Sequence, residues 1–238
     1  MSSGIQERVE RIDWRAVEAS LSESGFAHAG ALLSPDECQN LISLYADNTR
    51  FRSQVAMERF RFGKGDYKYL RHPLPESVAT LRKATYPHLA AIANHWQTAL
   101  GERGAAFPPE HEEFLRRCHR AGQTQPTPLL LHYEAGGFNC LHQDLYGKIA
   151  FPLQLVIMLG QQGQDWEGGE FVLVENIPRA QSRAEVLTAD LGHGIFFTTR
   201  YRPVKGSRGY YRVAVRHGVS RVRRGMRYTL GIIYHDAK

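Results

Sequence analysis

The sequence has few cysteines and no long apolar run. Its three cysteines, Cys38, Cys118 and Cys140, are scattered, so they form neither a disulfide framework nor a zinc-finger spacing. No apolar stretch reaches the ~18–20 residues that span a bilayer, and residues 1–14 are charged and lack the apolar core of a signal peptide. No glycine-rich loop leads into a helix in the pattern that binds phosphates. We therefore expect a reduced, cytoplasmic protein without a membrane segment or a nucleotide site.

The formal net charge of +6 is unevenly distributed along the 238 residues. Residues 1–125 hold 16 Lys and Arg against 15 Asp and Glu, whereas residues 126–238 hold 14 against 9. Within the second part, residues 179–227 contain twelve Lys and Arg, opposed by Glu185 and Asp190. Such a basic concentration favours an anionic partner such as nucleic acid. The alternative, which stays open, is that these arginines lie on the solvated face of exposed strands.

The first 125 residues are typical of a helix-rich region. Apolar residues at helical spacing predict a helix over 5–23, and a longer helical pattern covers about 76–100. At Ser34-Pro35-Asp36-Glu37 an N-cap serine, a proline at the first helical position and a glutamate three residues after the cap coincide, so a helix should begin there and run to about Tyr45. A short strand is expected over 25–30. Residues 51–72, rich in Arg, Phe, Tyr and Gly, are compatible with a hairpin.

Beyond Pro126 the pattern changes to short segments rich in Val, Ile, Phe, Leu and Tyr, separated by turn residues. Regularly spaced strands with few helices indicate a β-sandwich or barrel. The sequence shows no repeat and no linker, so the helical residues 1–125 and the β-rich residues 126–238 are expected to form one compact unit. The eight expected strands are 128–133, 138–144, 151–159, 169–175, 184–188, 194–199, 210–218 and 227–235.

A metal site is indicated by the triplet His142-Gln143-Asp144. On a strand, side chains two residues apart face the same way, about 6.6–7 Å apart at the backbone, so the imidazole and the carboxylate can converge on one ion. A distant histidine would complete the face of two histidines and one carboxylate that is diagnostic of non-haem Fe(II) oxygenases. His217, within an expected strand, is the best candidate. His132 and His193 suit the position less well, and His235 stays open.

Arg227 follows His217 on the next expected strand, and Thr229 shares its face. A guanidinium that faces the interior would form a two-pronged salt bridge with a carboxylate. Because an unpaired buried charge is costly, an inward Arg227 implies a bound anion. The alternative is that Arg227 is one more surface arginine.

These residues together resemble the iron and 2-oxoglutarate signature of the prolyl-hydroxylase-like oxygenase superfamily. More narrowly, the stretch from Tyr133 to His235 resembles a family of bacterial 2-oxoglutarate/Fe(II) oxygenases. The similarity covers nearly all of the second half, and the first half fits less specifically. The similar blocks are Leu141-His142-Gln143-Asp144-Leu145-Tyr146-Gly147, Gly168-Gly169-Glu170-Phe171-Val172-Leu173, Pro178-Arg179-Ala180-Gln181-Ser182-Arg183 and Arg216-His217-Gly218-Val219-Ser220.

The resemblance implies a mainly β fold with N-terminal helices, in which a double-stranded β-helix (jelly roll) forms the core. It implies a dioxygenase that uses Fe(II), 2-oxoglutarate and O2. By position, His142, Asp144 and His217 become iron ligands, and Arg227 anchors the distal carboxylate of 2-oxoglutarate. Tyr133 is similar to a tyrosine placed against the co-substrate, or else is a core aromatic. The remaining expected pocket residues are Thr229 and Gln154.

The substrate stays open at this point. A damaged nucleic-acid base suits both the family's suggested role and the basic region 179–227, and base chemistry on a duplex would require flipping. A protein side chain of the prolyl type and a small metabolite are the alternatives. From a different class comes a non-catalytic metal-binding barrel that binds nucleic acid. Cys140 is expected to be a small buried hydrophobe, with a place near the metal as its alternative, and residues 51–72 are a candidate substrate lid.

Overall fold

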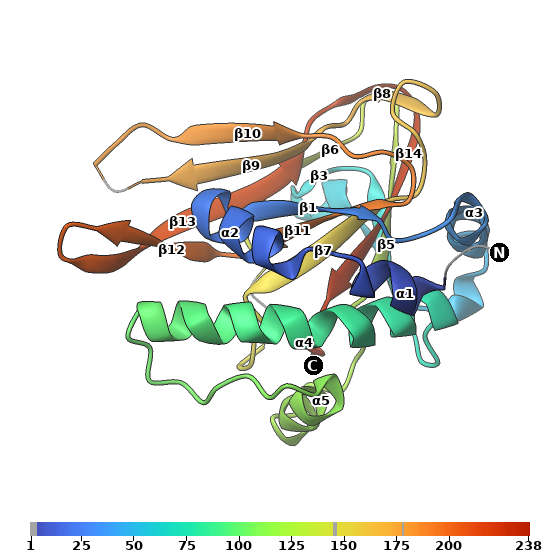
Figure 1. Cartoon of the computed structure of the whole chain (residues 1–238). Helices are drawn as coiled ribbons and strands as arrows, with labels where there is room; N and C mark the ends of the chain where they lie inside the picture. The colour runs from blue at the N-terminus through green and yellow to red at the C-terminus, as the bar shows by residue number, and fades with distance from the viewer. Residues whose placement is uncertain (1–3, 145–146, 178) are drawn as a thin grey trace.

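The computed structural model describes residues 4–144, 147–177 and 179–238, so Leu145, Tyr146 and Pro178 of the motif blocks lie outside the described residues. Within these ranges the chain forms helices mainly in its first half and strands mainly in its second (Figure 1). No helix of the described part has the length and apolarity needed to cross a membrane. The helices are α1 (Ile5–Glu10), α2 (Trp14–Ser24), α3 (Pro35–Leu44), α4 (Glu76–Ala99) and α5 (His111–Arg120), with 3-10 turns η1 (Asn48–Arg50) and η2 (Met57–Phe60).

Two antiparallel sheets make the β core, and both contain strands from the two halves of the chain. The major sheet has the order β1 (Phe26–Ala31), β11 (His193–Thr198), β7 (Leu153–Met158), β14 (Val222–Ile233), β5 (Leu129–Glu134), β4 (Asp66–Leu70) and β2 (Phe51–Ala56), with β8 (Trp166–Gly168) beside β14. The minor sheet has the order β10 (Arg183–Leu187), β9 (Phe171–Asn176), β13 (Gly209–Val219), β6 (Phe138–His142) and β3 (Gly63–Lys64), with β12 (Tyr201–Gly206) beside β13. This mainly β jelly-roll core confirms the expected fold class.

The alternation of side chains along the strands divides the core into two layers. On β7, Leu155 and Ile157 belong to a cluster shared with the helices, whereas Val156 and Met158 belong to a cluster between the sheets. Because successive side chains of a strand point to opposite faces, a strand covered on both sides is apolar throughout, as β7 is. The inner face of the major sheet is therefore free to contribute to a cavity between the sheets.

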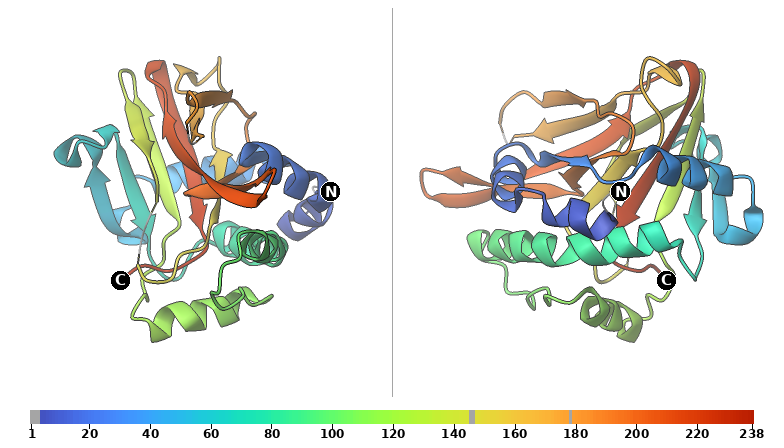
Figure 2. Two further views of the ribbon diagram at one scale, coloured as in Figure 1. Left: turned by 90° about the vertical axis from the view of Figure 1, so that its left-hand side faces the viewer. Right: turned by 45° about the vertical axis from the view of Figure 1, so that its right-hand side comes forward.

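The helices support the major sheet from outside. In Figure 1, α4 runs beneath the sheets and α5 lies beyond it, and both remain below the strands in the turned views of Figure 2. The capping box expected at Ser34 is present, with Ser34 accepting from the Glu37 amide. The expected single helix over 5–23 is wrong. It breaks between α1 and α2, because the Asp13 carboxylate caps a new helix by accepting from the amides of Arg15 and Ala16.

The strand predictions differ from the structure at four strands, β6, β8, β12 and β14. The hairpin expected within 51–72 is confirmed as β2 paired with β4. Strands β8 and β12 and helix α5 were not expected, and β14 begins at Val222 rather than 227. The strand expected over 138–144 ends at His142, so Asp144 follows β6 instead of belonging to it.

Arg82 of α4 fixes the C-terminal segment against the helices. Its buried guanidinium donates to the Ile233 and Tyr234 carbonyls at 2.9 and 3.0 Å and pairs with the buried Asp236 carboxylate at 2.9 Å. This pairing holds the end of β14. Residues of β14 line the cavity between the sheets.

We expect Arg82→Ala to lower the free energy of unfolding by about 3–5 kcal/mol, because the buried Asp236 carboxylate would lose its guanidinium and keep only His119 as a charged partner. The matched control is Lys83→Ala on the same helix. Lys83 pairs with Glu112 in solvent, where an ion pair contributes little. Equilibrium urea unfolding followed by circular dichroism measures both. Equal, small losses in the two variants would contradict the structural role assigned to Arg82.

Candidate metal centre

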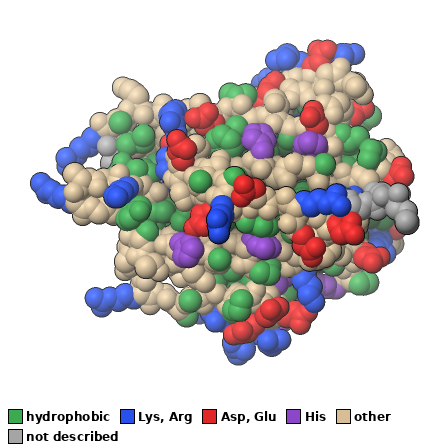
Figure 3. Space-filling view, viewed as in Figure 1, with side chains coloured by type: hydrophobic (Ala, Val, Ile, Leu, Met, Phe, Trp, Pro, Cys, Tyr) green, Lys and Arg blue, Asp and Glu red, His purple; other side chains and the backbone are tan. Residues whose placement is uncertain are grey.

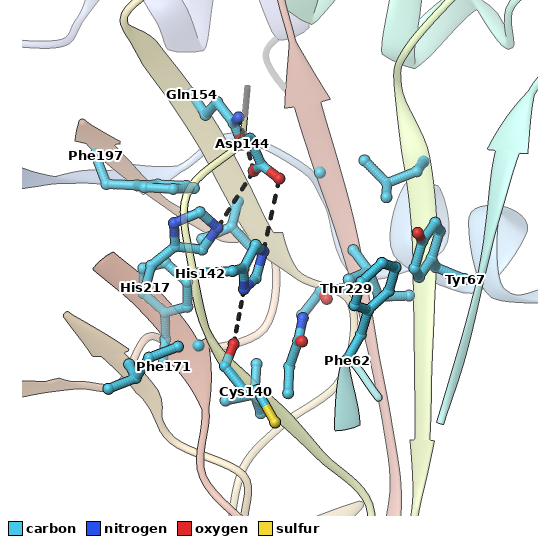
Figure 4. A pocket seen from close by; sticks show the side chains of 18 of the residues that line it. Phe62, Tyr67, Cys140, His142, Asp144, Gln154, Phe171, Phe197, His217 and Thr229 are labelled. Carbon is cyan, nitrogen blue, oxygen red and sulfur yellow. Dashed lines mark hydrogen bonds and ion pairs between the residues drawn. The ribbon is translucent and has the colours of Figure 1, made fainter. Parts of the chain in front are cut away.

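Two histidines meet because of the register between β6 and β13. His142 lies directly opposite His217 in the antiparallel pairing of these strands. Side chains at such opposed positions lie on the same face with Cβ atoms about 4.5–5.5 Å apart, and the two imidazole centroids are 4.2 Å apart. Both rings face the inside of the cavity between the sheets (Figure 4).

Asp144 completes the cluster from just beyond the end of β6. Its carboxylate oxygens lie 3.6 Å from Nε2 of His142 and 3.3 Å from Nε2 of His217. The three potential ligand atoms all lie within 4.8 Å of one another. The structure thus brings together the three residues expected as metal ligands, although the geometry of a continuous strand, on which the expectation rested, does not apply to Asp144.

The Nε2 atoms of both imidazoles face the Asp144 carboxylate, so they point to the place that a metal would take. Nδ1 of His142 lies 2.8 Å from the Cys140 carbonyl, to which it donates as Nδ1–H. A backbone carbonyl on one ring nitrogen is the usual way to fix the tautomer and orientation of a metal-ligating histidine. Nδ1 of His217 has no hydrogen-bond partner among the described residues, and its ring packs against Phe197 and Phe171.

The electrostatics of the cluster favour the protonation states that bind metal. Burial alone would raise the pKa of Asp144, but the hydrogen bond and charge of His217, the charge of His142 and the Gln154 amide together lower it. Burial, and then the neighbouring His217, lowers the pKa of His142. An ionised carboxylate and a neutral imidazole are the ligand forms that a metal requires.

Gln154 of β7 orients the carboxylate of Asp144. Its side-chain amide donates to Oδ2 of Asp144 at 2.9 Å, and the residue is buried. The sequence suggested Gln154 as a pocket residue for the co-substrate. It does line the cavity, and the partner that its amide contacts is the metal-site carboxylate.

Arg227 is a buried cation that forms no salt bridge with a carboxylate of the described residues. The side chain is 1 % exposed, and its Nε has no hydrogen-bond partner there. Its guanidinium contacts Thr229 Oγ1 at 3.5 Å and Met158 Sδ at 3.6 Å. Burial lowers its pKa to about 10, so it remains charged at neutral pH. The interpretation of Arg227 as a surface arginine is therefore wrong.

The surroundings of Arg227 are shaped to hold a guanidinium. The rings of Tyr133 and Trp166 lie 5.6 and 5.9 Å from its central carbon. Gly169 has a positive φ of 62°, and a Cβ there would lie 2.9 Å from Cδ of Arg227. The Gly168-Gly169 block thus makes room for this side chain, and a buried charge prepared in this way calls for an anion.

One cavity of about 410 Å³ joins the cluster to Arg227, a volume in the range of small-molecule sites. Tyr133 and Thr229 also line it, and the Tyr133 hydroxyl accepts from Nδ2 of Asn139 at 3.3 Å. Cys140 lines it as an exposed residue, so the expected small buried hydrophobe is wrong at this position. Backbone of Cys140, rather than its thiol, contacts His142.

The other candidate histidines take no part in the cluster. His132 contacts Asp66 at 3.1 Å, Nδ1 of His235 accepts from the Phe151 amide at 3.1 Å, and His193 begins β11. Arg61, Phe62 and Tyr67 also line the cavity, although the sequence did not single them out. Phe62 and Tyr67 lie opposite the metal cluster (Figure 4). Only the richness of residues 51–72 in arginine and aromatics was available as a signal.

Comparisons with known proteins give a family and a fold for this chain. Residues 65–237 match the model of a family described as "Oxygenase, catalysing oxidative methylation of damaged DNA". An uncharacterised protein of Mycobacterium tuberculosis is 50% identical over 165 residues, which are 69% of this chain and 70% of that protein. A prolyl-4-hydroxylase of Pseudomonas putida has a similar fold, with a TM-score of 0.52 and 14% identity over 94% of this chain and 99% of the other. So does a prolyl hydroxylase of Trichoplax adhaerens, solved with a hypoxia inducible factor peptide, with a TM-score of 0.54 and 16% identity over 98% of this chain and 92% of the other.

We expect Asp144→Ala to weaken Mn(II) binding by more than about 100-fold, because loss of a ligand should exceed the 10–100-fold effect of losing an outer partner. His193→Ala, which removes an imidazole outside the cluster, should bind Mn(II) as the wild type does. Anaerobic Mn(II) titration followed by electron paramagnetic resonance measures both affinities. Unchanged affinity in Asp144→Ala would remove this residue from the ligand set.

Gln154→Ala should weaken Mn(II) binding by an intermediate factor of about 10–100, because Asp144 loses the amide that orients it. The matched control is Gln161→Ala, whose amide contacts the exposed Asp190 away from the cluster. The same titration applies. If the two variants bind Mn(II) equally well, Asp144 does not need the Gln154 amide.

Proposed function

The chain belongs to the oxygenase family that residues 65–237 match, and on this premise we propose that it is an Fe(II)- and 2-oxoglutarate-dependent dioxygenase that oxidises a C–H bond of a damaged nucleic-acid base. One observation supports 2-oxoglutarate as the co-substrate. The guanidinium of Arg227 forms no salt bridge within the described residues, and it lies in the same cavity as the cluster of His142, Asp144 and His217. A bound dicarboxylate would supply both the missing counter-charge and the missing hydrogen-bond acceptors.

The donor set suits ferrous iron. Two imidazoles and one carboxylate are the ligands of non-haem Fe(II) oxygenases, and they leave coordination positions for a chelating co-substrate and O2. All three side chains converge from one end of the minor sheet, His142 and His217 on paired strands and Asp144 just beyond β6. These three residues would hold the ion at the wall of the cavity that also contains Arg227.

Each remaining residue has a distinct task in this proposal. Iron and 2-oxoglutarate, when bound, supply the oxidation, in which O2 is reduced as 2-oxoglutarate is converted to succinate and CO2 and one oxygen atom enters the substrate. Arg227 grips the distal carboxylate, and the Thr229 hydroxyl beside it donates a further hydrogen bond. Tyr133 packs its ring against the anchor. Apolar walls that include Phe171 and Phe197 exclude water from the cluster.

The family description supports a nucleic-acid substrate, and the basic region 179–227 supports it in part. Arg183, Arg202, Arg212 and Arg224 of this region pair with carboxylates, and Arg227 lies in the cavity. On the face seen in Figure 3, acidic and basic side chains are interspersed. The exposed cations of the region that form no ion pair within the described residues are Arg179, Arg200, Lys205, Arg208, Arg216, Arg221 and Arg223.

The competing functions make different demands on the same cavity. A protein side-chain hydroxylase needs a groove for an extended peptide, a metabolite oxidase needs no surface outside the cavity, and a non-catalytic barrel needs no anchor for a co-substrate. The prepared environment of Arg227 argues against the last of these. The exposed residues around the cavity mouth distinguish the others.

Arg227→Ala should raise the KM for 2-oxoglutarate on the order of 100-fold, because two charge-assisted hydrogen bonds of about 1.5–3 kcal/mol each are lost in part. Its Mn(II) affinity should stay near that of the wild type. The measurement is succinate formed from 2-oxoglutarate with Fe(II) and O2, without added substrate. Arg224→Ala on the same strand, which removes a solvent-exposed ion pair with Glu167, is the control and should leave the KM unchanged. A normal KM in Arg227→Ala would refute the anchor, and no succinate from the wild type would refute the dioxygenase.

A further inference from the structure

Two exposed aromatic rings stand at the mouth of the metal cavity. Phe60 is 53% exposed and Phe62 is 46% exposed, and their rings stack with centroids 5.5 Å apart at an angle of 21°. We call this pair the aromatic rim. Phe62 also lines the cavity, on the wall opposite the metal ligands (Figure 4). Large apolar side chains left together in solvent commonly mark a binding surface.

The loop that carries the aromatic rim is attached to the strand that carries His142. β3 pairs with β6, and the Cys140 amide donates to the Phe62 carbonyl at 2.7 Å. The loop begins at Met57, which is fully buried and whose amide donates to the Gly65 carbonyl at 2.9 Å. A Cβ at Gly63 would collide with the Phe138 carbonyl, so only glycine permits this close pairing.

The backbone of the loop holds a further sign of function. Arg61, between the two phenylalanines, has a φ of 60°, in the left-handed region that residues other than glycine adopt at a cost. Such conformations persist where the surrounding structure imposes them and are frequent at ligand sites. Here the residue ends the η2 turn and lies between Phe60 and Phe62.

The rim is surrounded by cations whose charge the described residues leave unpaired. Arg59, Arg61 and Lys64 are exposed and form no ion pair within the described ranges, and Glu58 is the single acidic residue of the loop. Arg221 adds a fourth cation on the neighbouring side, where it donates to the Gly136 carbonyl at 3.0 Å. Lys64 approaches the same glycine, since a Cβ there would lie 3.3 Å from its Nζ.

We propose that the aromatic rim is a stacking platform for single-stranded nucleic acid. Resting on the proposed oxygenase function, this inference places one base against Phe62 and the neighbouring phosphates at Arg59, Arg61 and Lys64, so that the adjacent base enters the cavity. Flat rings interleaved with cations match the alternation of bases and phosphates along a strand. An acidic peptide would match the cations, but its carboxylate side chains do not stack on two phenylalanine rings as a series of bases does. A base that reaches the metal must leave its stack, and the rim would replace the lost contact.

The test uses the full chain loaded with Mn(II) and 2-oxoglutarate and a single-stranded DNA 12-mer that carries one 2-aminopurine. Phe62→Ala should weaken binding by about 5- to 150-fold, the range for loss of one base–aromatic stack, and should abolish the change in 2-aminopurine fluorescence. Phe62→Trp should preserve both. Arg61→Ala should lower the slope of log affinity against log salt by about 1. Because Phe62 is half exposed, equal melting temperature and Mn(II) content verify that its variants are folded.

The matched competitor is Tyr210→Ala. Tyr210 is 49% exposed and, like Phe62, lies near exposed cations, Lys205 and Arg208, but it belongs to the β12–β13 hairpin and does not line the metal cavity. Weaker binding in Tyr210→Ala with wild-type binding in Phe62→Ala would overturn the rim in favour of that hairpin. A wild type that forms succinate yet binds no oligonucleotide at low salt would overturn the rim and the nucleic-acid substrate, and would leave the oxygenase intact. Phe62-dependent binding by a chain that forms no succinate would support the rim and refute the dioxygenase.

Discussion

The pairing register of β6 with β13 is the constraint on which the rest of the site depends. It sets His142 opposite His217, and a slip by one residue would turn one imidazole to the other face of the minor sheet. Asp144 has no strand to hold it, and its position depends instead on Gln154 of the major sheet. The metal cluster is therefore held jointly by the two sheets: two ligands are fixed by pairing within one sheet, and the third is oriented by a side chain of the other.

Arg227 differs from His142, Asp144 and His217 in the groups that surround its charge. His142, Asp144 and His217 contact one another, and the Asp144 carboxylate lies close to both imidazoles. Arg227 has aromatic rings, a hydroxyl and a thioether around it and no carboxylate that pairs with it in the described ranges. The folded chain thus keeps a desolvated cation without a salt-bridge partner in the described ranges. An anion that paired with it would stabilise the fold by RT ln(1 + [L]/Kd), where [L] is the concentration of the free anion.

The sequence predicted the residues of the site better than their surroundings. His142, Asp144, His217 and Arg227 were selected from their side-chain chemistry and order together with the family resemblance, and the structure brings them to one cavity. The Gln154–Asp144 contact depends instead on the spacing between the sheets. The strands β8 and β12 were missed because three residues, or a segment that contains Pro203, give little alternation to detect. Helix α5 was missed because its buried positions, His111, Phe114 and Cys118, are few within a highly charged segment. The break before α2 required recognising Asp13 as a cap.

A count of charged residues along the sequence does not show where a basic surface lies on the folded chain. The segment 179–227 is the basic part of the sequence, yet Arg202, Arg183 and Arg212 pair with Glu175 and Glu102, which lie outside it. The loop from Met57 to Lys64 belongs to a half of the chain whose charges nearly cancel, yet its cations form no ion pair in the described part of the chain. A cation without an ion pair offers more to a phosphate than an ion-paired guanidinium does. Arg61 of the loop lines the metal cavity, and the exposed rings beside it are a feature that a charge count does not register.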